Sequence, residues 1–105
     1  AAVTIGANVT IGHGAIVHAC TIKDFAFVGM GAVVMDLAIV EEYGMLAAGA
    51  VLTPKKTVKA GEIWAGNPAK YFRDMNQAEK DYMKVSADNY AELASEYKEI
   101  QENQK

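Results

Sequence analysis

A six-residue spacing of aliphatic side chains runs through the first half of the chain. One slip of a single residue, between Val17 and Ile22, interrupts this spacing. An α-helix repeats every 3.6 residues and a strand every 2, so a period of six fits short strands separated by corners and does not fit a helix. We expect the aliphatic side chains to point inward, and the small residues that follow most of them to let the chain turn past its neighbour. The aliphatic positions are Ile5, Ile11, Val17, Ile22, Val28, Val34, Val40, Leu46 and Leu52.

Three such strands close a triangular coil of about eighteen residues, so the period predicts a mainly β fold, a solenoid of hexapeptide repeats. Glycines such as Gly12 and Gly31 suit corners or a close approach of two backbones. Many outward positions of the strands are also apolar, and a surface of this kind is expected to be covered by the chain's own tail or by other subunits. These outward residues are Ile16, Phe27, Met30, Val33, Ile39, Met45 and Val51.

The chain is expected to leave the solenoid through residues 53–70, which hold two prolines and two glycines. This composition predicts an exit loop, with a short strand near residues 62–65. Trp64 is expected to plug the open end of the solenoid. Residues 1–70 therefore form one predicted unit, the hexapeptide-repeat solenoid with its exit loop.

Residues 71–105 predict a C-terminal helical tail that packs on the solenoid. This segment contains neither Gly nor Pro, and Asn76 followed by Glu79 is typical of a capping box at the start of a helix. We expect the helix to span about residues 77–101, with one apolar stripe against the solenoid. The stripe consists of Tyr90, Leu93, Tyr97 and Ile100.

Composition narrows the range of partners. The net charge is −3 and no basic stripe is present, which excludes nucleic acid as the main partner. Neither a membrane span nor a secretory leader is expected. Cys20 is the only cysteine, so no internal disulfide can form, and a cytoplasmic location is expected, with the mitochondrial matrix as the alternative. The chain starts without Met inside a repeat, from which we expect upstream sequence to be missing.

Both histidines lie on the first repeats, five residues apart. His13 comes two residues after the inward Ile11, and His18 comes one residue after the inward Val17, so a corner separates them. Imidazoles that diverge around a corner cannot converge on one zinc ion at the required Zn–N distance of about 2.0–2.1 Å. In a threefold assembly, however, His18 of one subunit and His13 of the next could meet across a ring-closing interface. A third ligand would then come from an earlier coil.

The stretch "IGHGAIVHACTI", followed by "FAFVGMGAVVMD", resembles the γ-class carbonic anhydrases over residues from Val3 to about Tyr97. The resemblance implies a left-handed parallel β-helix with a C-terminal α-helix, assembled as a homotrimer. It also implies a three-histidine metal site between subunits. Two of the family's ligands lie five residues apart in an "IGHxxxxHxCxI" pattern, and these match His13 and His18.

The same resemblance implies an activity: reversible hydration of CO2 to bicarbonate by a metal-bound hydroxide. Zn²⁺ is the expected cofactor, with Fe²⁺ or Co²⁺ as alternatives. The family takes its first metal histidine and the polar residues of its pocket from an earlier coil, so the sequence assigns no catalytic proton-transfer residue. We expect the activity of a zinc-dependent carbonic anhydrase only from the full-length protein.

Two other functions fit the sequence. The first is a non-catalytic trimeric scaffold, or a subunit of a larger complex, within the same family, because fold does not imply function. The second is a hexapeptide acyltransferase, since "GNPAK" within "EIWAGNPAKYFRDM" recurs in those enzymes. No long insertion interrupts the repeats from Ile5 to Leu52, which argues against an acyltransferase.

Overall fold

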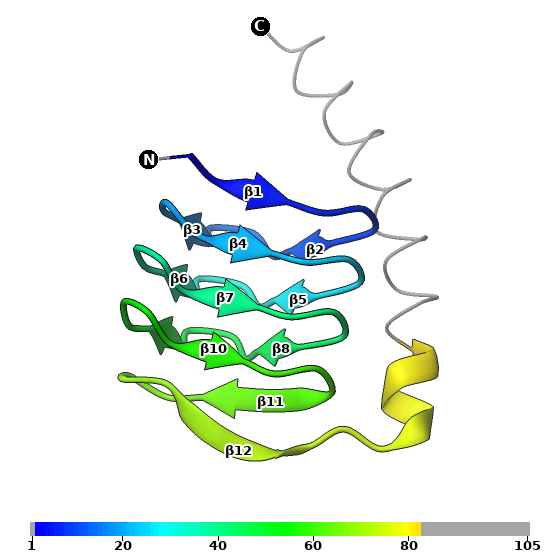
Figure 1. The fold of residues 1–105 in the computed structure, drawn as a ribbon. Coiled ribbons are helices and arrows are strands. Elements are labelled where there is room, and N and C mark those ends of the chain that lie inside the picture. Colours follow the sequence, from blue (N-terminus) through cyan, green and yellow to red (C-terminus); the bar gives the residue numbers. More distant parts are fainter. Residues whose placement is uncertain (1, 83–105) are drawn as a thin grey trace, which may run out of the picture.

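The computed structural model describes residues 2–82, which form a triangular solenoid of short strands followed by the start of a helix (Figure 1). The chain passes each of three faces in turn, and each face is a sheet made from every third strand. All strand pairs are parallel except the last, β11 with β12. The first face holds β1 (Thr4–Ile5), β4 (Thr21–Ile22), β7 (Ile39–Val40) and β10 (Thr57–Val58); the second holds β2 (Thr10–Ile11), β5 (Phe27–Val28), β8 (Met45–Leu46), β11 (Glu62–Ala65) and β12 (Lys70–Asp74); the third holds β3 (Ile16–Val17), β6 (Val33–Val34) and β9 (Val51–Leu52). The expected fold class, mainly β with hexapeptide-repeat coils, is confirmed.

The slip in the period appears in the register between coils. Val17 lies opposite Val34, 17 residues later, whereas Val34 lies opposite Leu52, 18 residues later. The corner between β3 and β4 is therefore one residue shorter than the corner between β6 and β7 below it. Ala19 occupies this short corner with a left-handed backbone conformation, φ 44°. Because the turn absorbs the missing residue, the inward side chains stay aligned from one coil to the next.

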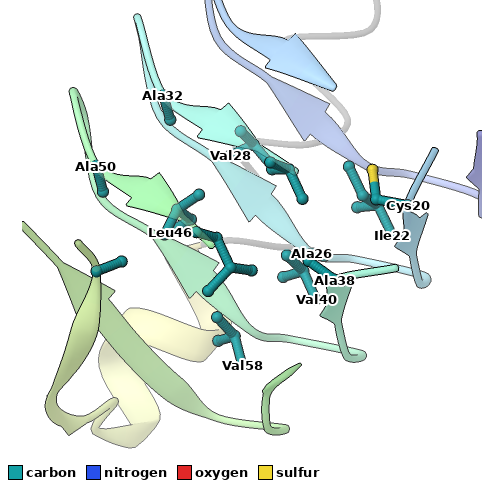
Figure 2. Close-up of a cluster of buried hydrophobic side chains, with 13 residues drawn as sticks. Cys20, Ile22, Ala26, Val28, Ala32, Ala38, Val40, Leu46, Ala50 and Val58 are labelled. Carbon is teal, nitrogen blue, oxygen red and sulfur yellow. The ribbon is translucent and has the colours of Figure 1, made fainter. Parts of the chain in front are cut away.

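The inward positions form one column of apolar side chains along the solenoid axis (Figure 2). Small residues such as Ala32 and Ala38 fill the corners between the larger side chains, and both are fully buried. The first described coil differs, because within residues 2–82 only one of its sides packs on another coil. Ile5 is 46% exposed, although it occupies an inward position in register with the fully buried Ile22. The fully buried large residues are Ile22, Val28, Val34, Val40, Leu46, Leu52 and Val58.

The solenoid continues further along the chain than the sequence analysis predicts. Residues 53–70 were expected to be an exit loop, but β10 pairs with β7 inside this range, and Val58 is fully buried. The six-residue spacing persists at Val58, while the lysines and Pro54 before it lie in a corner. The expected short strand is confirmed as β11, whose bounds are Glu62–Ala65.

Trp64 lies at the end of the solenoid opposite the N-terminus, as expected. It pairs with Leu46 of the coil above and packs, partly buried, against the main core. Its indole Nε1 donates a hydrogen bond to Glu62 Oε1 at 3.1 Å. The ring thus covers the last buried layer while its one polar atom is satisfied.

The expected helix begins at Gln77, and its described part runs over residues 77–82. The capping box is confirmed, because Glu79 N donates to Asn76 Oδ1 at 2.8 Å and Asn76 N donates to Glu79 Oε1 at 3.1 Å. Just before the helix, Met75 is buried against Ile63 of the second face. The apolar stripe expected at Tyr90, Leu93, Tyr97 and Ile100 lies outside the described residues.

Part of the outward apolar surface is covered by the segment that leads into this helix. Phe27 and Met45 of the second face pack against the pair formed by Ile63 and Met75. On the third face, by contrast, Ile16 is 56% exposed. Across residues 2–82, no helix has the length and apolarity needed to cross a membrane.

Candidate metal site

His13 lies in the corner between β2 and β3, held by glycines on both sides. A Cβ added at Gly12 would lie 2.5 Å from Met30 N in the coil below, so only glycine fits this close approach. Gly14 has a φ of +73°, which L side chains rarely adopt. The backbone carbonyl of His13 accepts a hydrogen bond from Gly31 N at 3.0 Å. These contacts fix the backbone of the corner and leave the imidazole exposed.

His18 lies in the short corner that follows β3. Its backbone N donates to Val34 O at 2.9 Å, and Leu37 N donates to Ala19 O at 2.8 Å. The backbone is thus tied to the next coil on both sides of the histidine. The side chain points away from the core and is 72% exposed.

Asp36 contacts His18 from the coil below. Its Oδ1 lies 2.5 Å from His18 Nδ1, and 59% of its side chain is exposed. The contact engages Nδ1 and leaves Nε2 of the imidazole open to a ligand. Asp36 was not among the candidates predicted from the sequence. It follows His18 by 18 residues, the length of an unshortened coil, whereas the coil between Val17 and Val34 has 17.

Cys20 is close to the histidines in sequence but does not share their surface. It is only 2% exposed and belongs to the buried core, where burial raises the pKa of its thiol. A buried, protonated thiol is not available as a metal ligand beside the exposed imidazoles. The exposed imidazole nitrogens of this region belong to His13 and His18.

A single chain does not complete a metal site within residues 2–82. No group of three or more His, Cys, Asp and Glu side chains in this range could hold a metal ion. His13 and His18 stand at different corners of the first coil, with strand β3 between them. Their assignment as metal ligands thus stays a prediction, and it requires donors from outside one described chain.

The arrangement of strands shows that the protein is a hexapeptide-repeat β-solenoid. A hexapeptide transferase family protein from Anaplasma phagocytophilum superposes with a TM-score of 0.82 at 49% identity, over 90% of this chain and 61% of that one. A putative acetyltransferase from Bacillus cereus has the same TM-score at 28% identity, over 93% of this chain and 63% of that one. No family model matches the sequence.

Curated relatives narrow the class. γ-Carbonic anhydrase 2 of Arabidopsis thaliana, a mitochondrial protein, is 48% identical over 90 residues, which are 86% of this chain and 32% of that protein. YrdA of Escherichia coli is 39% identical over 94 residues, 90% of this chain and 51% of that protein. These matches confirm the resemblance to the γ-carbonic anhydrases that the histidine motif indicated. It spans between about a third and a half of the length of these two relatives.

Proposed function

We propose that this chain carries part of a γ-carbonic anhydrase that catalyses the reversible hydration of CO2 at a metal site shared between subunits. The observation that supports the proposal is the placement of two exposed imidazoles at successive corners of one coil, in a chain 48% identical to a γ-carbonic anhydrase. Rings at different corners cannot serve one ion from one chain. A homotrimer, in which the corner of one subunit meets that of the next, brings His18 and His13 together.

The residues present fit a divalent metal with nitrogen ligands. Neutral imidazoles suit Zn²⁺, with Fe²⁺ and Co²⁺ as alternatives, and both rings are exposed and accessible. When bound, such an ion lowers the pKa of a coordinated water, which provides a nucleophile for CO2 at neutral pH. His13 and His18 would hold and orient the ion. The rigid coil backbone holds each ring's point of attachment in place.

A mixing experiment on the protein in its natural length tests the shared site. We expect His13→Ala and His18→Ala each to lose bound zinc while the trimer stays folded, because both side chains are exposed. Trimers mixed from the two variants contain interfaces that pair an intact His18 with an intact His13. These trimers should regain part of the zinc and of the CO2 hydration activity.

The control for mixing is the double variant, His13→Ala with His18→Ala, combined with either single variant. No interface in those trimers holds both rings, so zinc content should stay at background. Zinc is measured by elemental analysis and oligomeric state by native mass spectrometry. If trimers mixed from the two single variants never regain zinc, the shared site is wrong.

Two alternative functions, a non-catalytic scaffold and an acyltransferase, can each be tested separately. A non-catalytic scaffold of the same family would form the trimer without hydrating CO2, so an assay on zinc-loaded protein separates it from the enzyme. An acyltransferase is favoured by the similarity to the putative acetyltransferase from Bacillus cereus. The corners from β1 to β9 carry no long excursion, which argues against an acyl-CoA groove of the usual kind. Calorimetric titration with acetyl-CoA tests that function directly.

The relatives support a mitochondrial location. Three Arabidopsis γ-carbonic anhydrases with 43–48% identity to this chain are mitochondrial proteins. We therefore favour the mitochondrial matrix over the cytoplasm. Fractionation of cells that express the natural-length protein would test this location.

A further inference from the structure

Asp24 and Asp36 occupy equivalent corner positions in the solenoid, but their carboxylates contact different groups. Asp24 and Asp36 each precede a corner residue with positive φ, Phe25 at 59° and Leu37 at 61°. Asp24 Oδ1 accepts a hydrogen bond from the backbone N of Ala7, one coil above, at 2.8 Å. Among residues 2–82, Asp36 accepts no hydrogen bond from a backbone N–H and instead contacts the His18 ring.

The corner that faces Asp36 from the coil above, residues 18–20, is shorter than the corner that contains Asp36. Only three residues, 18–20, connect β3 to β4, whereas four, 35–38, connect β6 to β7 beneath them. The slip in the hexapeptide period therefore falls in the corner that begins with His18. The backbone bonds from His18 N to Val34 O and from Leu37 N to Ala19 O hold the two corners in register.

We propose that Asp36 is a positioning residue that fixes the tautomer of His18 and so makes Nε2 the nitrogen presented to a metal ion. An ionised carboxylate can only accept a hydrogen bond, so Nδ1 must carry the hydrogen. Nε2 then keeps its lone pair, which is the form that a metal binds. The inference rests on the proposed metal site and adds which nitrogen of His18 binds and what holds it.

His13 supplies an internal reference. Within residues 2–82, its ring has no hydrogen-bonding partner, so nothing in this part of the chain selects one of its tautomers. An exposed side-chain contact such as that between Asp36 and His18 adds little to folding stability, because solvent screens it and both side chains lose freedom. Its effect should therefore be seen in the state of the ring rather than in the stability of the fold.

Nitrogen NMR of the metal-free protein at alkaline pH, where free imidazole is neutral, reads the tautomer of each ring. In the wild type, His18 should be predominantly protonated at Nδ1, and in Asp36→Ala it should take the same mixture of tautomers as His13. Asp24→Ala is the matched control: it removes a corner carboxylate and a backbone hydrogen bond, yet should leave the His18 tautomer unchanged. A wild-type His18 protonated at Nε2, or unchanged in Asp36→Ala, would overturn the proposal.

Metal affinity separates this inference from the proposed function. In the natural-length protein, Asp36→Ala should weaken zinc binding by about 10- to 100-fold, the usual loss when the partner of a ligating histidine is removed, and Asp24→Ala should not. Equal zinc affinity in the wild type and Asp36→Ala would contradict the positioning role. If His18 shows the Nδ1 tautomer but the protein binds no zinc, the positioning role of Asp36 is supported and the proposed metal site is wrong.

Discussion

At the scale of single residues, the glycines around His13 have two different physical roles. Gly12 is required by space, because an added Cβ would lie 2.5 Å from the backbone N of Met30. Gly14 is required by conformation alone, because its φ is +73° and nothing lies within 4 Å of an added Cβ. From the sequence, Gly12 was expected either at a corner or at a close approach of two backbones, and Gly14 was not singled out. A period shows where a corner lies but not which atoms of the next coil face it.

Two alanine substitutions test this distinction. Gly12→Ala should lower the free energy of unfolding by about 3 kcal/mol or more, because backbone atoms cannot move aside as a flexible side chain does. Gly14→Ala should cost only about 1–2 kcal/mol, the penalty of a left-handed conformation for an L residue. Chemical denaturation of the two variants measures both values. Equal losses, or the larger loss in Gly14→Ala, would show that the close approach is not as described.

At the scale of elements, the start of the C-terminal helix combines a capping box with an ion pair. The Arg73 guanidinium donates to both carboxylate oxygens of Glu79, at 2.6 and 2.8 Å. Glu79 Oε1 also accepts from the Asn76 backbone. These hydrogen bonds, with Arg73 the larger cause, lower the pKa of Glu79 from 4.5 to about 2. The sequence predicted the box from its local spacing, whereas Arg73 reaches Glu79 only through the course of β12.

This pKa predicts an acid-sensitive helix start. A carboxyl whose pKa is lower in the folded state stabilises that state above its unfolded pKa, and the contribution disappears as the pH falls through the folded value. Hydrogen-exchange protection of the Asn76 and Glu79 amides should therefore decline between about pH 4.5 and pH 2. Glu79→Gln keeps an acceptor for the cap but cannot ionise, so its protection should change less over this range. Identical pH profiles for the two proteins would refute the assignment.

At the scale of the whole molecule, stability depends on how many coils each inward residue contacts. Ile5 and Ile22 occupy the same position in successive coils, but Ile22 is fully buried and Ile5 is 46% exposed. In a solenoid each repeat is stabilised mainly by its neighbours, so a coil between two others gains interactions on both sides. An inward isoleucine therefore contributes more to the free energy of unfolding in a coil between two others than in a coil with one neighbour.

The pair Ile22→Ala and Ile5→Ala measures this inequality. Ile22→Ala should destabilise the fold by about 2–5 kcal/mol, because it leaves a cavity between coils. In a protein of these 105 residues, Ile5→Ala should cost about 1 kcal/mol, since much of its side chain is already in contact with solvent. Urea denaturation gives both values. A loss for Ile5→Ala as large as that for Ile22→Ala would mean that the first coil is covered in solution.

The sequence by itself determined the coils, because inward packing imposes a period that every repeat must obey. It also determined the capping box, since both partners lie within one helical turn. Only the tertiary structure decided which residues meet between coils. The Asp36–His18 contact depends on a register shifted by the short corner at Ala19. The exposure of Ile5 depends on its place in the first coil of the described residues. Contacts between coils are set by three-dimensional register, which local spacing does not fix.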